Sequence, residues 1–156
     1  MSSAAIPLPD IEATQALARR AAGLARPGDL LALWGDLGAG KTAFARAFVN
    51  ALPGADEPVP SPTFTLVQTY ERGALPVWHV DLYRLEEPEE ALELGLEDAL
   101  ADAVVLLEWP QRLGPLLPGR RVDLHFEQAG QGRQVTLEPH GLPPERAAAW
   151  RALHAA

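Results

Sequence analysis

The 156-residue sequence contains no cysteine and only one lysine. The absence of cysteine excludes disulfides, thiol catalysis and cysteine-ligated metal centres. The lysine, Lys41, is the exception among 13 basic residues, since the other twelve are arginines. A lysine ammonium is a compact point charge, whereas an arginine guanidinium is a planar fork. The exception therefore indicates that position 41 needs a point charge.

Basic residues are also scarce relative to acidic ones, 13 against 21, which gives a net charge of −8. Such a balance argues against a chain that binds nucleic acid or a membrane surface by itself, because phosphates favour clustered Lys and Arg. No apolar run approaches transmembrane length, and the N-terminus lacks a signal-peptide pattern. We expect a cytoplasmic, soluble protein in which residues 1–156 form a single domain.

Apolar periodicity and turn residues divide the chain into alternating helices and strands. Helices are predicted at residues 11–25, 41–52 and 143–154, and in two pieces at 86–102, which Gly95 separates. Strands are predicted at residues 29–34, 63–71, 77–83, 103–107, 121–126 and 133–138. This order favours an α/β fold. It would have three layers and a mixed, partly parallel sheet with antiparallel hairpin additions.

The strongest motif lies between the first predicted strand and the second predicted helix. It matches G-x-x-x-x-G-K-[ST] without a mismatch, and its residues are Gly35, Asp36, Leu37, Gly38, Ala39, Gly40, Lys41 and Thr42. The glycines allow backbone N–H groups to surround a phosphate, and the helix start adds its positive end. Lys41 would contact the β- and γ-phosphates, and the Thr42 hydroxyl would bind Mg²⁺. We expect Asp36 to face outward. A glycine-rich turn without a ligand is the disfavoured alternative.

Two acidic residues lie at or near the ends of predicted strands. They are candidates for the second protein ligand of Mg²⁺, after Thr42. Glu108 follows five apolar residues and is the better candidate, although a surface acid would fit the same pattern. Asp81 could hold Mg²⁺ through water or orient the attacking water. A salt bridge to Arg84 is an equally good interpretation of Asp81.

Other polar residues are less informative. Ser61 and Thr63 lie in an extended proline-rich segment where P-loop proteins carry switch segments, but simple turn chemistry explains them as well. His79 is interpreted as a packed or hydrogen-bonded core histidine. The four histidines of the chain have no metal-ligand spacing. Trp34 is expected in the core, whereas Trp109 could lie in the core or flank a bound nucleotide.

The absence of several nucleotide-related motifs indicates which nucleotide is bound. An N-K-x-D motif for guanine is impossible, because the only lysine already belongs to the glycine-rich loop. Neither an LSGGQ-like signature nor an arginine-rich kinase lid is present. The sequence therefore favours ATP, bound by a minimal module that acts on a partner.

Beyond this loop, the chain resembles the TsaE family, small bacterial P-loop ATPases of tRNA threonylcarbamoyladenosine biosynthesis. The resemblance covers nearly the whole chain. It rests on IPLPD…AT (6–14), GDLGAGKT (35–42), SPTFTLV (61–67), HVDLYRL (79–85), a P-E-E then LG segment (88–95) and LLEWPQR (106–112). Two departures are visible. Ala43 stands where a second hydroxyl residue is common, and Pro60 stands where a polar or basic residue often precedes S-P-T.

The resemblance implies a Mg²⁺-dependent ATPase with low intrinsic activity. It would support a two-protein threonylcarbamoyl transferase of TsaB- and TsaD-like proteins, which modifies adenosine 37 of tRNA. Contact with tRNA would be indirect, through the complex, and no membrane is involved. The resemblance places the Mg²⁺ ligands on Thr42 and Glu108 and the functional aspartate on Asp81, beside Arg84. It places the switch-like segment on Ser61 and Thr63. Further nucleotide contacts are expected at Ala43, Thr14 and Arg133.

Two alternative functions stay open at this level. A small-molecule kinase would transfer phosphate to a metabolite. A nucleotide-dependent interaction module would support its partner without hydrolysis.

Overall fold

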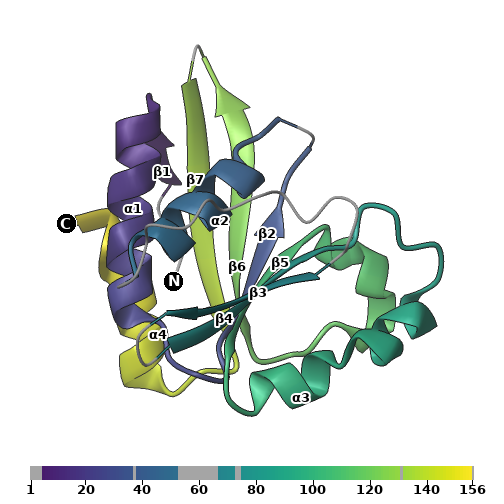
Figure 1. The fold of residues 1–156 in the computed structure, drawn as a ribbon. Helices are drawn as coiled ribbons and strands as arrows, with labels where there is room; N and C mark the ends of the chain where they lie inside the picture. Colours follow the sequence, from purple (N-terminus) through teal and green to yellow (C-terminus); the bar gives the residue numbers. More distant parts are fainter. Residues whose placement is uncertain (1–4, 37, 53–66, 73–74, 131, 156) are drawn as a thin grey trace.

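A computed structural model describes residues 5–36, 38–52, 67–72, 75–130 and 132–155. These residues build one seven-stranded sheet with the order β1-β7-β6-β2-β5-β4-β3 (Figure 1). The strands are β1 (Ala5–Leu8), β2 (Leu30–Trp34), β3 (Val67–Arg72), β4 (Leu75–Asp81), β5 (Val104–Glu108), β6 (Arg121–Ala129) and β7 (Gly132–His140). The helices are α1 (Ile11–Leu24), α2 (Lys41–Asn50), α3 (Leu96–Leu100) and α4 (Pro144–Arg151), with 3₁₀ segments η1 (Pro88–Leu94), η2 (Pro110–Leu116) and η3 (Ala152–Ala155).

The centre of the sheet is parallel and its two edges are antiparallel. Strand β2 pairs in parallel with both β5 and β6, and β5 pairs in parallel with β4. The hairpin partner β3 closes one edge, while β7 and β1 extend the other edge. Every residue of β5 is buried, as expected for a strand covered on both faces. The carboxyl ends of β2, β4 and β5 consequently meet at one edge of the sheet.

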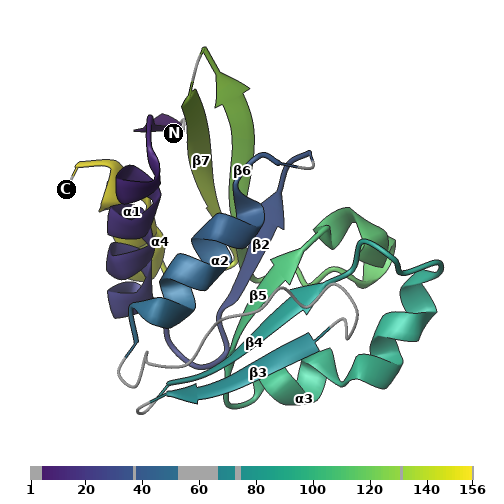
Figure 2. The same cartoon turned by 45° about the horizontal axis from the view of Figure 1, so that its top comes forward.

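Helical segments cover both faces of the sheet, which gives three layers (Figure 2). Helices α1, α2 and α4 bury Leu17, Phe44, Phe48 and Trp150 against one face. The η1, α3 and η2 segments bury Ala91, Ala99 and Leu113 against the β2, β4 and β5 side chains of the other face. The α/β fold with a mixed, partly parallel sheet and antiparallel hairpin additions is therefore confirmed.

The described elements differ from the predicted ones in several places, and the 3₁₀ segment η2 was not predicted. Strand β1 was not predicted because prolines interrupt its pattern, and it pairs only with β7 at the sheet edge, where proline is tolerated. The segment before Gly95 is 3₁₀ rather than α-helical. Strands β6 and β7 are longer than predicted, since each runs on to the tip of their hairpin. Strand β4 begins and ends two residues earlier than predicted, so Asp81 is its last residue.

Among the described residues, no helix combines the length and the apolar character needed to cross a membrane.

Candidate functional site

The glycine-rich segment forms a tight turn between β2 and α2. Gly35, Gly38 and Gly40 adopt φ values of 143°, 78° and 112°, which residues with a side chain rarely adopt. A Cβ on Gly35 would lie 2.7 Å from the carbonyl oxygen of Phe126, so only glycine fits there. Helix α2 begins directly after the turn, and its N-cap residue is Gly40. Its first backbone N–H groups therefore lie beside the loop, as the motif predicts.

Lys41 reaches back over this turn. Its residue is only 4% exposed, and its Nζ donates a hydrogen bond of 2.5 Å to the carbonyl oxygen of Gly35. The same ammonium lies 3.3 Å from the centre of the Trp109 ring. Burial lowers the pKa of Lys41, while the negative charges of Glu108, Asp81 and Asp36 act in the opposite direction. The lone lysine thus lies beside its own loop, close to two carboxylates.

Glu108 joins the loop to the strand ends. Its Oε1 accepts a hydrogen bond of 2.8 Å from the Thr42 hydroxyl, across 66 positions of sequence. Its Oε2 lies 2.6 Å from Nε2 of His79 on the neighbouring strand β4. Glu108 is 2% exposed and His79 is fully buried. Burying a carboxylate so far from water costs free energy unless such partners form hydrogen bonds with it.

Asp81 lies beside Glu108, since the two residues are register partners of the parallel strands β4 and β5. Its Oδ1 accepts a hydrogen bond of 2.9 Å from the Tyr83 backbone N–H. Burial raises the pKa of Asp81, and the negative charge of Glu108 raises it further. The Tyr83 hydrogen bond and the electrostatic interactions with His79 and Lys41 act in the opposite direction. Raised carboxylate pKa values of this kind are typical of functional sites. We call Lys41, Thr42, His79, Asp81 and Glu108 the strand-end site.

Two small cavities share Arg133 in their lining, and one of them adjoins the glycine-rich loop. One of about 210 Å³ is lined by Gly38, Gly40, Lys41, Thr42, Ala43 and Arg133. The other, also about 210 Å³, lies between the start of α1 and the β6–β7 hairpin, and its lining includes Thr14 and Arg133. Arg133 therefore borders both cavities, and its Cδ would lie 3.4 Å from a Cβ on Gly40.

The remaining predicted positions lie further out or outside the described part of the chain. Asp36 is exposed, as expected, and its backbone carbonyl accepts a hydrogen bond of 3.1 Å from the Ala39 N–H. Arg84 is exposed, three residues after Asp81. Leu37, Ser61 and Thr63 lie outside the described residues, so their proposed roles stay predictions.

Two residues in or beside the strand-end site, His79 and Trp109, were not predicted to contact its members. His79 is a buried core histidine, as expected, but its contact with Glu108 makes it part of the site. The signal was available, because alternation along a strand places His79 and Asp81 on the same face. Trp109 had been left open between the core and a position beside the nucleotide. It has the only positive φ (61°) found at a non-glycine residue in the described part of the chain. No sequence pattern predicts that conformation, which accompanies the contact of Trp109 with Lys41.

Together these groups can stabilise a bound polyanion and hold a hard cation. Lys41 and the α2 N-terminus supply positive charge, while the hydroxyl of Thr42 and the carboxylates of Glu108 and Asp81 supply oxygen ligands.

Known proteins give an independent view of the chain. The model of the family "Threonylcarbamoyl adenosine biosynthesis protein TsaE" matches residues 8–135. The tRNA threonylcarbamoyladenosine biosynthesis protein TsaE of Bacillus subtilis is 41% identical over 132 residues, which cover 83% of this chain and 82% of that protein. The protein of the same name from Rickettsia felis is 39% identical over 124 residues, 80% of this chain and 72% of that one.

The fold has a solved counterpart as well. The crystal structure of Bacillus subtilis YdiB superposes with a TM-score of 0.79 at 31% sequence identity. The match covers 100% of this chain and 99% of that one. The resemblance seen in the motifs is thus confirmed along most of the sequence and in three dimensions, and this chain belongs to the TsaE family of threonylcarbamoyladenosine biosynthesis proteins.

Proposed function

We propose that this chain binds ATP with Mg²⁺ at the strand-end site and hydrolyses it slowly by itself, and faster with partner proteins of tRNA threonylcarbamoyladenosine synthesis. The observation that carries the proposal is the 2.8 Å contact between the Thr42 hydroxyl and Glu108. A hydroxyl at the end of the glycine-rich loop and a carboxylate at a strand end are the two protein ligands that Mg²⁺ needs in P-loop NTPases.

The local geometry supports a phosphate at the loop. Lys41 already points its ammonium at the loop carbonyl of Gly35, and the first turn of α2 follows directly. Thr42 and Glu108 would hold the metal ion, with Asp81 close enough to join through water. Bound Mg²⁺ would bridge phosphate oxygens and offset their charge. All these ligands are oxygens, which is the donor type that Mg²⁺ prefers.

Each of the other residues at the site has its own proposed role in binding or hydrolysis. Lys41 contributes a positive charge that burial has stripped of water, so it attracts a phosphate strongly. His79 holds one oxygen of Glu108 and so fixes the direction of the other. Asp81, which lies beside Glu108 and has a raised pKa that makes it a better proton acceptor than an ordinary aspartate, would orient an attacking water. Thr14 and Arg133, beside the second cavity, are proposed to contact the nucleoside.

Partner dependence is proposed from family membership and from charge. The partners would be a two-protein threonylcarbamoyl transferase of TsaB- and TsaD-like proteins. A net charge of −8 disfavours independent tRNA binding, so tRNA would be reached through the complex. We expect slow turnover in isolation, because the sequence shows no arginine finger directed at the γ-phosphate.

The test is the rate of Mg²⁺-dependent ATP hydrolysis with and without the purified transferase pair from the same source. The Lys41→Ala protein supplies the background, and Arg46→Ala, on an exposed position of the same helix, is the matched loss of one cation. We expect strong stimulation by the pair that Lys41→Ala loses and Arg46→Ala keeps.

Two other results would contradict this proposal. Phosphate transfer to a metabolite would favour the kinase alternative. Full support of tRNA modification by Glu108→Ala or Asp81→Ala proteins that bind ATP without hydrolysing it would favour the interaction module.

A further inference from the structure

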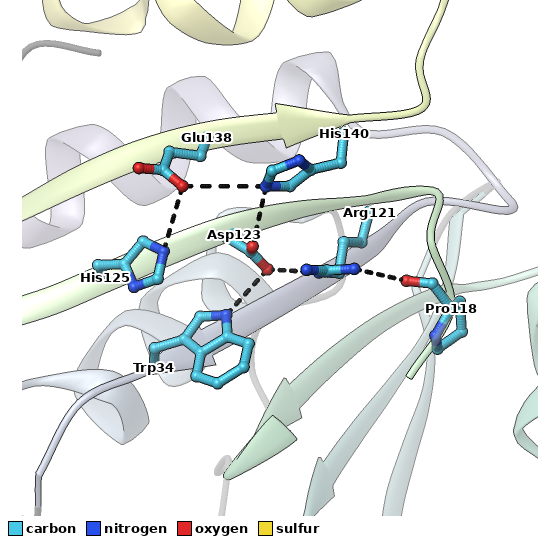
Figure 3. A network of polar contacts seen from close by, with 7 residues as sticks. All are labelled: Trp34, Pro118, Arg121, Asp123, His125, Glu138 and His140. Atoms are coloured by element: carbon cyan, nitrogen blue, oxygen red, sulfur yellow. Dashed lines mark hydrogen bonds and ion pairs between the residues drawn. The ribbon is translucent and has the colours of Figure 1, made fainter. Parts of the chain in front are cut away.

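A second polar cluster lies on the sheet face opposite α1, α2 and α4. It consists of Asp123 and His125 on β6 and Glu138 and His140 on β7, and we call it the open-face cluster (Figure 3). Alternation along β6 places Val122, Leu124 and Phe126 in the core on the helix-covered face, so the cluster faces the other way. About 40–46% of the His125, Glu138 and His140 side-chain surface is open to solvent, whereas Asp123 is 4% exposed.

The ligand atoms of Asp123, Glu138 and His140 lie close to one another. Nε2 of His140 lies 3.1 Å from Oδ2 of Asp123 and 3.9 Å from Oε2 of Glu138. One ligand atom from each of these three residues lies within 4.8 Å of the other two. Nε2 of His125 lies 3.6 Å from the same Glu138 oxygen. In tetrahedral zinc sites with bonds of about 2.0–2.2 Å, neighbouring ligand atoms are about 3.3 Å apart. The distances from His140 to Asp123 and Glu138, 3.1 and 3.9 Å, lie on either side of that spacing.

The buried carboxylate of Asp123 is oriented by neighbours that leave one oxygen for a ligand. Its Oδ1 accepts hydrogen bonds of 2.8 Å from both Trp34 Nε1 and Arg121 Nε. Arg121 is held in turn by the carbonyl oxygen of Pro118 at 3.0 Å. Oδ2 is thereby directed at His140. The ring of Trp34 also stacks on His125, with centroids 5.7 Å apart. Such outer contacts fix the direction of ligands in metal sites.

The donor set selects the kind of ion. Two imidazole nitrogens and two carboxylate oxygens suit zinc and related transition metals, whereas Mg²⁺ prefers oxygen alone. With neutral imidazoles, Asp123 and Glu138 contribute two negative charges and Arg121 one positive charge, so a divalent cation meets a net attraction. Ion pairing alone is a weak reason to gather these groups, because half-exposed pairs contribute little stability.

We propose that Asp123, Glu138 and His140 bind a divalent transition-metal ion of the zinc type, with His125 as the fourth ligand. This site is separate from the strand-end site and does not depend on ATP hydrolysis.

The experiment is a zinc titration of the full chain, freed of metal with a chelator and followed by calorimetry. Cobalt absorption would serve as a second readout of tetrahedral coordination. We expect one equivalent of zinc, with an affinity that falls by more than about 100-fold in His140→Ala and in Glu138→Gln. Glu127→Gln, on β6 outside the cluster and hydrogen-bonded to Gln134, is the matched control and should bind like the parent.

Zinc binding at the open-face cluster must also be distinguished from zinc binding at the His79–Glu108 pair. A titration that His140→Ala leaves unchanged and Glu108→Ala abolishes would place the zinc at the strand-end site and overturn the proposal. Zinc binding that is equally weak in the parent and in all variants would overturn it too. His140 is half-exposed, so both His140→Ala and the conservative His140→Gln should fold, which far-ultraviolet circular dichroism checks.

Discussion

The strand-end site and the open-face cluster use the same residue types in different surroundings. Each pairs a histidine Nε2 with a carboxylate, at 2.6 Å for His79 and Glu108 and at 3.1 Å for His140 and Asp123. His79 is fully buried, whereas 42% of the His140 side chain is exposed. In the buried pair, solvent cannot exchange with the histidine, so it can only position its carboxylate. In the open pair, the histidine is accessible to an incoming ion. Burial, rather than residue type, separates the two roles.

The largest expected effect concerns the ammonium group of Lys41 at the strand-end site. Replacing Lys41 by Ala should reduce partner-stimulated ATP hydrolysis by about 100-fold or more, because one preorganised charge at the phosphates is lost. Zinc binding at the open-face cluster should stay unchanged. Parallel ATPase assays and zinc titrations on one preparation measure both. A loss of both activities would show that the two regions are not independent.

The next effect concerns the turn that lies between the two regions. Gly35→Ala should cost about 2–3 kcal/mol of unfolding free energy, since the new Cβ would meet the Phe126 carbonyl and Gly35 has a positive φ. Urea unfolding measures it. Gly38→Ala is the matched control, with positive φ but nothing within 4 Å of the added Cβ, and should cost only about 1 kcal/mol. Equal costs would exclude the clash as the cause.

A smaller effect tests the support of the open-face cluster. Trp34→Phe removes the indole donor to Asp123 while Arg121 keeps its own hydrogen bond, so we expect a loss of about 1 kcal/mol of stability. A double-mutant cycle with Asp123→Asn isolates the pair in urea unfolding. ATP affinity should change by less than about threefold, because Trp34 precedes the glycine-rich loop without entering it. A coupling energy near zero would mean that the indole does not hold Asp123.

The smallest effect is a pH dependence at Asp81. Its folded-state pKa is raised above 3.8, so the native state binds this proton more readily than the unfolded state does. The ionised group therefore opposes folding as the pH rises through the folded-state pKa. Asp81→Asn keeps the acceptor for the Tyr83 N–H and should gain up to about 1 kcal/mol at pH 7.

This gain should vanish below pH 3.8, where the parent carboxyl is protonated in both states. Urea unfolding across that range measures it, with Asp102→Asn as a control at an exposed carboxylate. A gain that persisted unchanged at low pH would indicate a cause other than ionisation.

Much of the strand-end site could be predicted because its signals are local. The spacing of glycines, Lys41 and Thr42 specifies a strand–turn–helix, and an apolar run ending in Glu108 specifies a strand end. The parallel pairing of β2 with β5 then brings the two together. The contact of His79 with Glu108 escaped prediction, since choosing its partner requires the strand order as well as the alternation.

The open-face cluster shows the opposite case. Its histidines have no metal-ligand spacing, and Trp34 was expected in the core, yet it is only half-buried and donates to Asp123. The register of the β6–β7 hairpin decides which residues face one another, and the β2–β6 pairing adds Trp34. Register depends on packing across the whole sheet, so no local pattern contains it.

The sequence by itself therefore determined the α/β class, the glycine-rich loop, the candidate acids and the family, because each depends on residues close in the chain or on motifs in order. Tertiary structure alone decided which side chains share a point in space and how much water reaches them. Charge, pKa and ligand exchange depend on that exposure, which is why the buried histidine and the open histidines of one sheet are assigned different chemistry.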